Sequence, residues 1–84
     1  MTFGSWSNLK DFFKRQHGFK SWTFDGDYQT LIIEFKNAKQ ASNAVKKNRQ
    51  TDNEITAYGD VEINGKGEII VELYDDAEKN LSNG

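Results

Sequence analysis

The chain of 84 residues contains no cysteine, no proline and only one histidine. Without cysteine it can form no disulfide, no thiolate zinc site and no cysteine nucleophile, which suits a reducing compartment. No stretch approaches the roughly 18 apolar residues of a membrane span, and the N-terminal residues lack the basic segment and apolar run of a secretion signal. The sequence therefore predicts a cytoplasmic protein that is neither exported nor embedded in a membrane.

The residue inventory also indicates a protein that is not an enzyme. His17 has no second imidazole for a metal pair, and its place before Gly18 suits a charge at a helix C-terminus better than catalysis. Asp25, Gly26 and Asp27 have the composition of a tight turn and lack the further oxygen ligands of a calcium loop. We therefore expect no catalytic residue, no metal and no cofactor.

Charge is distributed unevenly along the chain. Residues 1–50 contain nine Lys/Arg and four Asp/Glu, a net of +5, whereas residues 51–84 contain two and nine, a net of −7. The total of −2 therefore conceals a polarised molecule, and a partner is expected at one of its charged surfaces. Lysine outnumbers arginine nine to two, which disfavours a reader of specific DNA sequences, because arginine forks match guanine edges and phosphates.

Two segments have the pattern of amphipathic helices. Apolar residues at helical spacing predict a helix near the N-terminus, with Ser7 or Asn8 as its N-cap and Gly18 just past its end. Asn37 is expected to cap a second helix that ends near Gln50 and turns small residues inward, which lets a helix lie close to a sheet.

Two further segments have the pattern of β-hairpins. Residues 20–24 and 29–35 are rich in aromatic and β-branched side chains and flank turn residues. In the second hairpin, apolar residues alternate from Ile55 to Ile63 and again after a three-residue loop in which Gly67 takes the left-handed conformation. This loop length predicts three cross-strand pairs: Ile63 with Ile69, Val61 with Val71, and Gly59 with Leu73.

In this register the second hairpin has an acidic face. Asp60 is expected opposite Glu72, and like charges in direct opposition destabilise a hairpin, so folding alone does not favour the arrangement. Residues two apart along a strand are about 6.6 Å apart, so such a ladder can present charge to a site built for phosphates. The competing interpretation is an ordinary wet face whose charges prevent edge-to-edge aggregation. The candidate partner-binding residues are Asp60, Glu62, Glu68, Glu72, Tyr58 and Tyr74.

A second set of candidates is basic. Lysines near one another, together with an exposed aromatic ring, can grip a single nucleic-acid strand. Trp6 and Trp22 are the aromatic candidates, although tryptophan in a domain of this size is more often a packing residue. The candidate nucleic-acid-binding residues are Lys10, Lys14, Arg15, Lys39, Lys46, Lys47 and Arg49.

These patterns predict one α+β domain over residues 1–84, with the order α-ββ-α-ββ. Its two hairpins would form a four-stranded antiparallel sheet with both helices packed on one face, and residues after about 78 would fray.

The leading hypothesis for function is a non-catalytic regulator or inhibitor that binds another protein through the acidic face. Mimicry of nucleic acid is one form of this hypothesis, and a small inhibitor of a phage or mobile element would be of this type. The alternative is a small nucleic-acid-binding module that uses the lysine-rich helices. A monomer is expected, or a weak homodimer through Tyr58, Ile70 and Tyr74.

Overall fold

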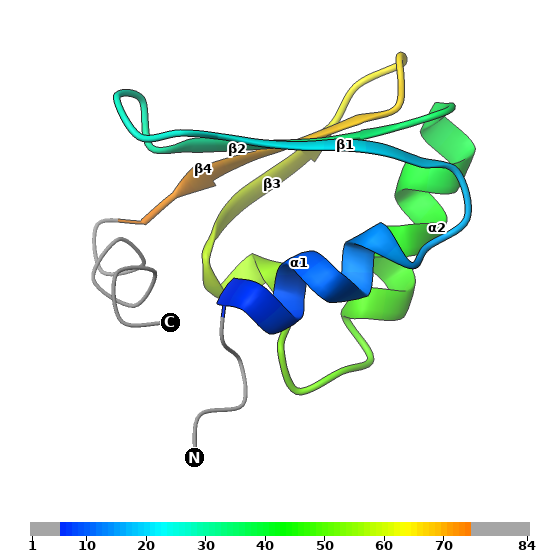
Figure 1. Ribbon diagram of the computed structural model, residues 1–84, viewed down its shortest axis with the longest axis horizontal. Helices are drawn as coiled ribbons and strands as arrows, with labels where there is room; N and C mark the ends of the chain where they lie inside the picture. The colour runs from blue at the N-terminus through cyan, green and yellow to red at the C-terminus, as the bar shows by residue number, and fades with distance from the viewer. Residues whose placement is uncertain (1–5, 75–84) are drawn as a thin grey trace.

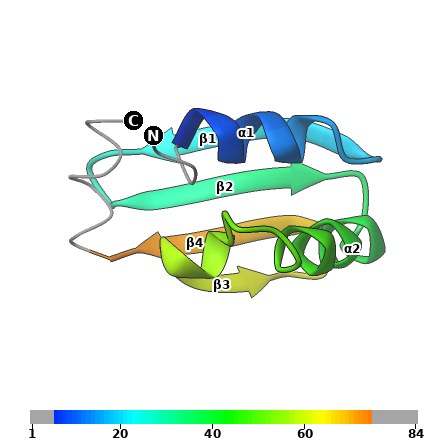
Figure 2. The same cartoon turned by 90° about the horizontal axis from the view of Figure 1, so that it is seen from below.

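The computed structural model describes residues 6–74, whose elements alternate between helices and hairpins. They are α1 (Trp6–Lys14), β1 (Phe19–Asp25), β2 (Thr30–Phe35), α2 (Ala38–Asn48), the 3-10 turn η1 (Ile55–Ala57), β3 (Gly59–Ile63) and β4 (Glu68–Leu73). All strand pairs are antiparallel, and the strand order is β1-β2-β4-β3. Both helices lie on one side of the sheet (Figure 1), with α1 along β1 and α2 over β4 and β3 (Figure 2). The predicted fold class and element order are confirmed.

The first helix begins earlier than its apolar pattern suggests. Because α1 starts at Trp6, Ser7 and Asn8 lie in its first turn, and the prediction that one of them is the N-cap is wrong. The Trp6 ring lies 5.1 Å from the ring of Trp22 in β1, so Trp6 also belongs to the apolar face of the helix. Gly18 follows the helix with φ 90°, as predicted for the residue that turns the chain into β1.

The second helix connects the two hairpins. The side chain of Asn37 accepts a hydrogen bond from the Gln40 backbone N–H at 2.9 Å, which confirms the predicted N-cap. The helix ends at Asn48, two residues before the predicted end. Its buried apolar residues are Ala41, Ala44 and Val45.

Asn48 holds the loop that follows α2. Its side chain is only 1% exposed, and Oδ1 accepts a hydrogen bond from the Ile55 backbone N–H at 2.6 Å. Its Nδ2 donates to the carbonyl oxygen of Asn53 at 3.0 Å. One buried amide therefore satisfies two backbone groups of the loop and fixes where η1 begins.

The second hairpin has the predicted register. Ile63 pairs with Ile69, Val61 with Val71 and Gly59 with Leu73. The loop residue Gly67 has φ 93°, so it supplies the left-handed conformation that the three-residue loop requires. Asn64 closes the turn, since its Oδ1 accepts hydrogen bonds from the backbone N–H groups of Lys66 and Glu68, each at 3.0 Å.

The core lies between the sheet and the helices. Inward side chains of the central strands, including Leu31, Ile33, Ile69 and Val71, are fully buried against Leu9 and Phe13 of α1 and the small residues of α2. None of the helices within residues 6–74 has the length and apolar character needed to cross a membrane. The expected fraying after residue 78 concerns residues outside the described range.

Candidate functional site

The face of the sheet opposite the helices brings together acidic side chains from all four strands. In β2 and β4 the fully buried residues alternate with half-buried or exposed ones, so the second set points away from the helical layer. The register of the three strand pairs places the matching residues of β1 and β3 on the same side. We call this surface the open face, and its carboxylates are Asp25, Glu34, Asp60, Glu62, Glu68 and Glu72.

One row of carboxylates crosses the sheet at the end where β4 finishes. Asp25 pairs with Thr30, Thr30 pairs with Glu72, and Glu72 pairs with Asp60. Neighbouring strands are about 4.8 Å apart, so the row extends over about 14 Å. We call it the first acidic row, and it contains the predicted opposition of Asp60 and Glu72.

A second acidic row lies nearer the other end of the sheet. Glu34 of β2 pairs with Glu68 of β4, and both side chains are half-buried. The Glu34 carboxylate accepts a hydrogen bond from Ser21 Oγ at 3.1 Å and lies 3.7 Å from Lys20 Nζ. Asn64 Nδ2 donates to the Glu68 carboxylate at 2.6 Å. These contacts orient both carboxylates of this row.

An apolar strip separates the two acidic rows. Ile32 of β2 pairs with Ile70 of β4, and each is half-buried although no described element covers it. Thr23 continues the strip on β1, while Glu62 ends it on β3. The open face is thus an apolar floor bordered by carboxylates on three sides.

Five of the six predicted partner-binding residues are on this surface. Asp60, Glu62, Glu68 and Glu72 project from the open face, and the exposed Tyr74 follows β4. The Tyr74 hydroxyl donates a hydrogen bond to Asp60 Oδ1 at 3.0 Å. That hydrogen bond and the charge of Asp60 raise the pKa of the Tyr74 phenol, so the ring stays neutral and holds the carboxylate in place.

The predicted placement of Tyr58 on the acidic face is wrong. Tyr58 is only 7% exposed and belongs to the core, where its ring lies 5.8 Å from Trp6 and its hydroxyl donates to Asn53 Oδ1 at 2.8 Å. Burial raises the pKa of its hydroxyl, and the hydrogen bond to Asn53 offsets part of the shift. The strand alternation does not reach Tyr58, because Ile55–Ala57 form a 3-10 turn and β3 begins only at Gly59.

The sequence interpretation missed Asp25, Glu34 and the apolar strip. Alternation in β2 was visible in the sequence, since Ile32 and Glu34 are spaced like an outward-facing pair. Their link to the acidic hairpin depends on the pairing of β2 with β4, which joins two hairpins distant in sequence.

Cations are scarce on the open face and abundant on the helical layer. Within residues 6–74 one ion pair is present, between Lys20 and Glu34, so the other five carboxylates of the open face have no cationic partner there. The predicted basic residues are all exposed on or just after α1 and α2: Lys10, Lys14, Arg15, Lys39, Lys46, Lys47 and Arg49. The charge split along the chain thus becomes a split between the two sides of the sheet.

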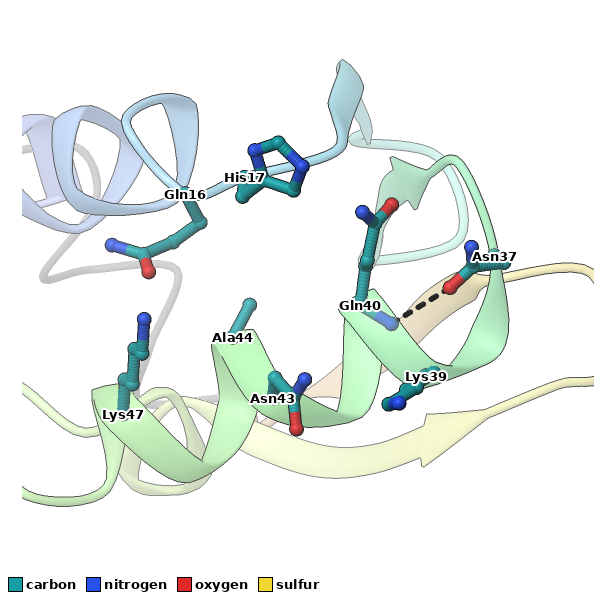
Figure 3. Close-up of a pocket in the computed structure, with 8 residues that line it drawn as sticks. All are labelled: Gln16, His17, Asn37, Lys39, Gln40, Asn43, Ala44 and Lys47. Atoms are coloured by element: carbon teal, nitrogen blue, oxygen red, sulfur yellow. Dashed lines mark hydrogen bonds between the residues drawn. The ribbon is translucent and has the colours of Figure 1, made fainter.

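The helical layer contains a pocket of about 290 Å³ where the C-terminal end of α1 faces α2 (Figure 3). Two of the predicted basic residues, Lys39 and Lys47, are among its lining residues. The tryptophans form no stacking platform beside it, because Trp6 packs edge-on against Trp22 at 5.1 Å and both rings are half-buried. The lining residues are Gln16, His17, Asn37, Lys39, Gln40, Asn43, Ala44 and Lys47.

The chain matches no protein-family model, no curated protein and no solved structure. Within residues 6–74 no three His, Cys, Asp or Glu side chains gather where they could hold a metal ion.

Proposed function

We propose that the protein is a non-catalytic, cytoplasmic regulator or inhibitor that binds a basic surface of another protein through the open face. The observation that carries the proposal is the set of six carboxylates on one sheet face. Within residues 6–74 no element covers this face, and Lys20 is its only ion-paired cation. A nucleic-acid-handling protein is the favoured partner class, because its binding surface is built to receive regularly spaced negative charge.

The arrangement of charge favours this function over a merely solvated surface. A wet sheet face that only prevents aggregation is served by charges of both signs, and interspersed signs avoid repulsion. Here Asp60 and Glu72 are direct neighbours across two strands, while exposed lysines are on the opposite side of the sheet. Such segregation costs some stability and creates a negative potential that attracts a basic partner.

The geometry also supports mimicry of a nucleic-acid strand. Along β3, Asp60 and Glu62 project on the same side with a spacing of about 6.6 Å, and on β4 Glu68 and Glu72 project on that side at about twice this spacing, with Ile70 between them. Protein sites that hold successive phosphates present lysines and arginines in series, and such a series can engage a ladder of carboxylates.

The test is an affinity capture from lysate of the source cell with three forms of the protein, each with and without nuclease. The first is the wild type, and the second neutralises the face by Asp60→Asn, Glu62→Gln, Glu68→Gln and Glu72→Gln. The control, Asp11→Asn with Asp52→Asn, removes exposed carboxylates outside the sheet.

We expect one protein to be retained by the wild type and the control, to be lost from the neutralised variant, and to be insensitive to nuclease. Equal retention by all three forms, with circular dichroism showing that the variant is folded, would contradict the proposal.

The alternative, a nucleic-acid-binding module, rests on the seven exposed cations that lie on or just after the two helices. It predicts binding to single or double strands that weakens steeply between low and physiological salt. Retention equal in all three forms and abolished by nuclease would favour it. A flat salt response would rule it out.

The open face also bears on self-association. Two copies meeting through it would oppose carboxylates with carboxylates, and Tyr58, one of three residues expected in a dimer patch, is buried in the core. We therefore favour a monomer, to be checked by light scattering over a range of concentrations.

A further inference from the structure

Building on the proposed function, we propose that the open face receives an amphipathic basic α-helix of the partner, lying across the strands with its apolar side on Ile32 and Ile70. The partner would then be a protein that reads DNA with a helix. The inference comes from the layout of the open face, in which the two acidic rows run along either side of the apolar strip.

The width of the strip fits a helix. Thr30 and Glu34 on β2, and likewise Glu72 and Glu68 on β4, are four residues apart, which places the two acidic rows about 13 Å from each other. An α-helix with its side chains is about 10 to 12 Å in diameter. A helix centred on Ile32 and Ile70 would therefore reach a carboxylate row with the long side chains on each of its flanks.

The width of the sheet across its four strands also suits a short helix. Four strands spaced about 4.8 Å apart give a width of about 14 Å, which corresponds to about ten helical residues at 1.5 Å each. Three helical turns of this kind offer an apolar stripe of three or four residues and several lysines or arginines on the two flanks.

Backbone chemistry favours a helix over an extended arm on this face. The backbone groups of β2 and β4 are paired with their neighbouring strands, so these strands offer no free backbone donors or acceptors to an extended peptide. An extended segment lying flat on Ile32 and Ile70 would leave many of its own N–H and C=O groups without partners. A helix satisfies its internal backbone groups and contributes only side chains.

The spacing of the two acidic rows is similar to the width of the DNA major groove. The major groove is about 12 Å wide, is bordered by two phosphate backbones and admits an α-helix that can contact thymine methyl groups on its floor. On the open face, the acidic rows occupy the place of the two backbones, and the isoleucine methyl groups occupy the place of the floor. This correspondence identifies the partner by chemistry as a protein with a basic recognition helix.

The test uses synthetic peptides and the intact protein labelled with nitrogen-15. The first peptide has fifteen residues, with a leucine and alanine stripe flanked by lysine and arginine. The second has the same charge, but two central alanines are replaced by proline, which breaks the helix. Affinity is measured by fluorescence anisotropy at low and physiological salt, and backbone amide shifts locate the site.

We expect the helical peptide to bind at least tenfold tighter than the proline peptide and to shift the amides of Ile32, Ile70 and Glu62. The double variant Ile32→Thr with Ile70→Thr keeps β-branched residues in both strands and should lose most of that tenfold preference. The control Asp52→Asn should retain it, because Asp52 is in the loop after α2.

The two proposals fail in different ways. Equal affinity for both peptides, with shifts on the open face, would overturn the helix inference and leave a basic partner in place. Failure of both peptides to bind the wild type at low salt would overturn the proposed function as well. Shifts confined to α1 and α2 would also overturn both.

Discussion

Neutralising Glu72 should stabilise the protein although it removes a charge from the candidate site. Glu72 is exposed on the central strand β4 and pairs directly with Asp60, while Thr30 is its neighbour on the other side. It has no ion pair within residues 6–74. The substitution Glu72→Gln keeps the shape of the side chain and removes the repulsion from Asp60.

The magnitude follows from the pairing. Directly opposed side chains are about 5 Å apart, and two unit charges at that distance in water repel by about 0.8 kcal/mol. Screening with a Debye length of about 8 Å at physiological ionic strength reduces this to about 0.4 kcal/mol. For a domain of this size, the gain corresponds to a rise in melting temperature of about 2 to 3 °C.

Urea unfolding and thermal melts followed by circular dichroism measure the effect. We expect Glu72→Gln to be more stable than the wild type at low salt and indistinguishable from it in about 1 M salt, where the Debye length falls to about 3 Å. Asp52→Asn, which removes an exposed charge from the loop after α2, should show no comparable gain. A loss of stability in Glu72→Gln, or a gain that persists at high salt, would refute the reasoning that this face is frustrated by like charge.

Three further outcomes test the fold. Asn48→Ala leaves the buried Ile55 N–H without its acceptor. The free energy of unfolding, measured by urea titration, should fall by about 2 to 3 kcal/mol. A loss below about 0.5 kcal/mol would contradict the role assigned to Asn48. Gly67→Ala places an alanine at φ 93°, with its Cβ 2.7 Å from the Asn37 carbonyl carbon. The same titrations should show that the free energy of unfolding falls by about 1 to 3 kcal/mol. An unchanged urea midpoint would contradict this backbone strain. Because burial raises the pKa of Tyr58, the unfolded chain ionises first as the pH rises, and stability that is complete below pH about 10 should fall above it. Thermal melts between pH 9 and about 11 should show that Tyr58→Phe reduces this loss, and an identical pH dependence would contradict it.

The second hairpin could be predicted from sequence because its signals are local. Apolar alternation from Gly59 onwards, together with a glycine at the one loop position that needs positive φ, selects a single register. The same rule fails at Tyr58, because alternation does not hold through the 3-10 turn, whose first residue Ile55 donates its backbone N–H to Oδ1 of the buried Asn48. Burial of that amide is a tertiary effect, and no periodicity in the sequence reports it.

The composition of the open face could not be predicted for a different reason. Each hairpin shows its own outward residues, but the sequence does not state which strands of the two hairpins become neighbours. The pairing of β2 with β4 brings Glu34 beside Glu68 and Ile32 beside Ile70. The acidic surface is therefore larger than the second hairpin alone indicated, and it includes carboxylates from the basic half of the chain.

The segregation of charge across the sheet gives a physical reason why attachment would be specific in orientation. A protein with a large negative net charge attracts a basic partner to every side, whereas the net charge of this chain is only −2. A basic partner approaching α1 and α2 meets exposed lysines and is repelled, and one approaching the sheet meets six carboxylates. Electrostatic complementarity of this kind determines the encounter orientation and rate more than the final affinity. The apolar strip between the acidic rows would then contribute the short-range contacts that distinguish an amphipathic basic helix from other basic segments.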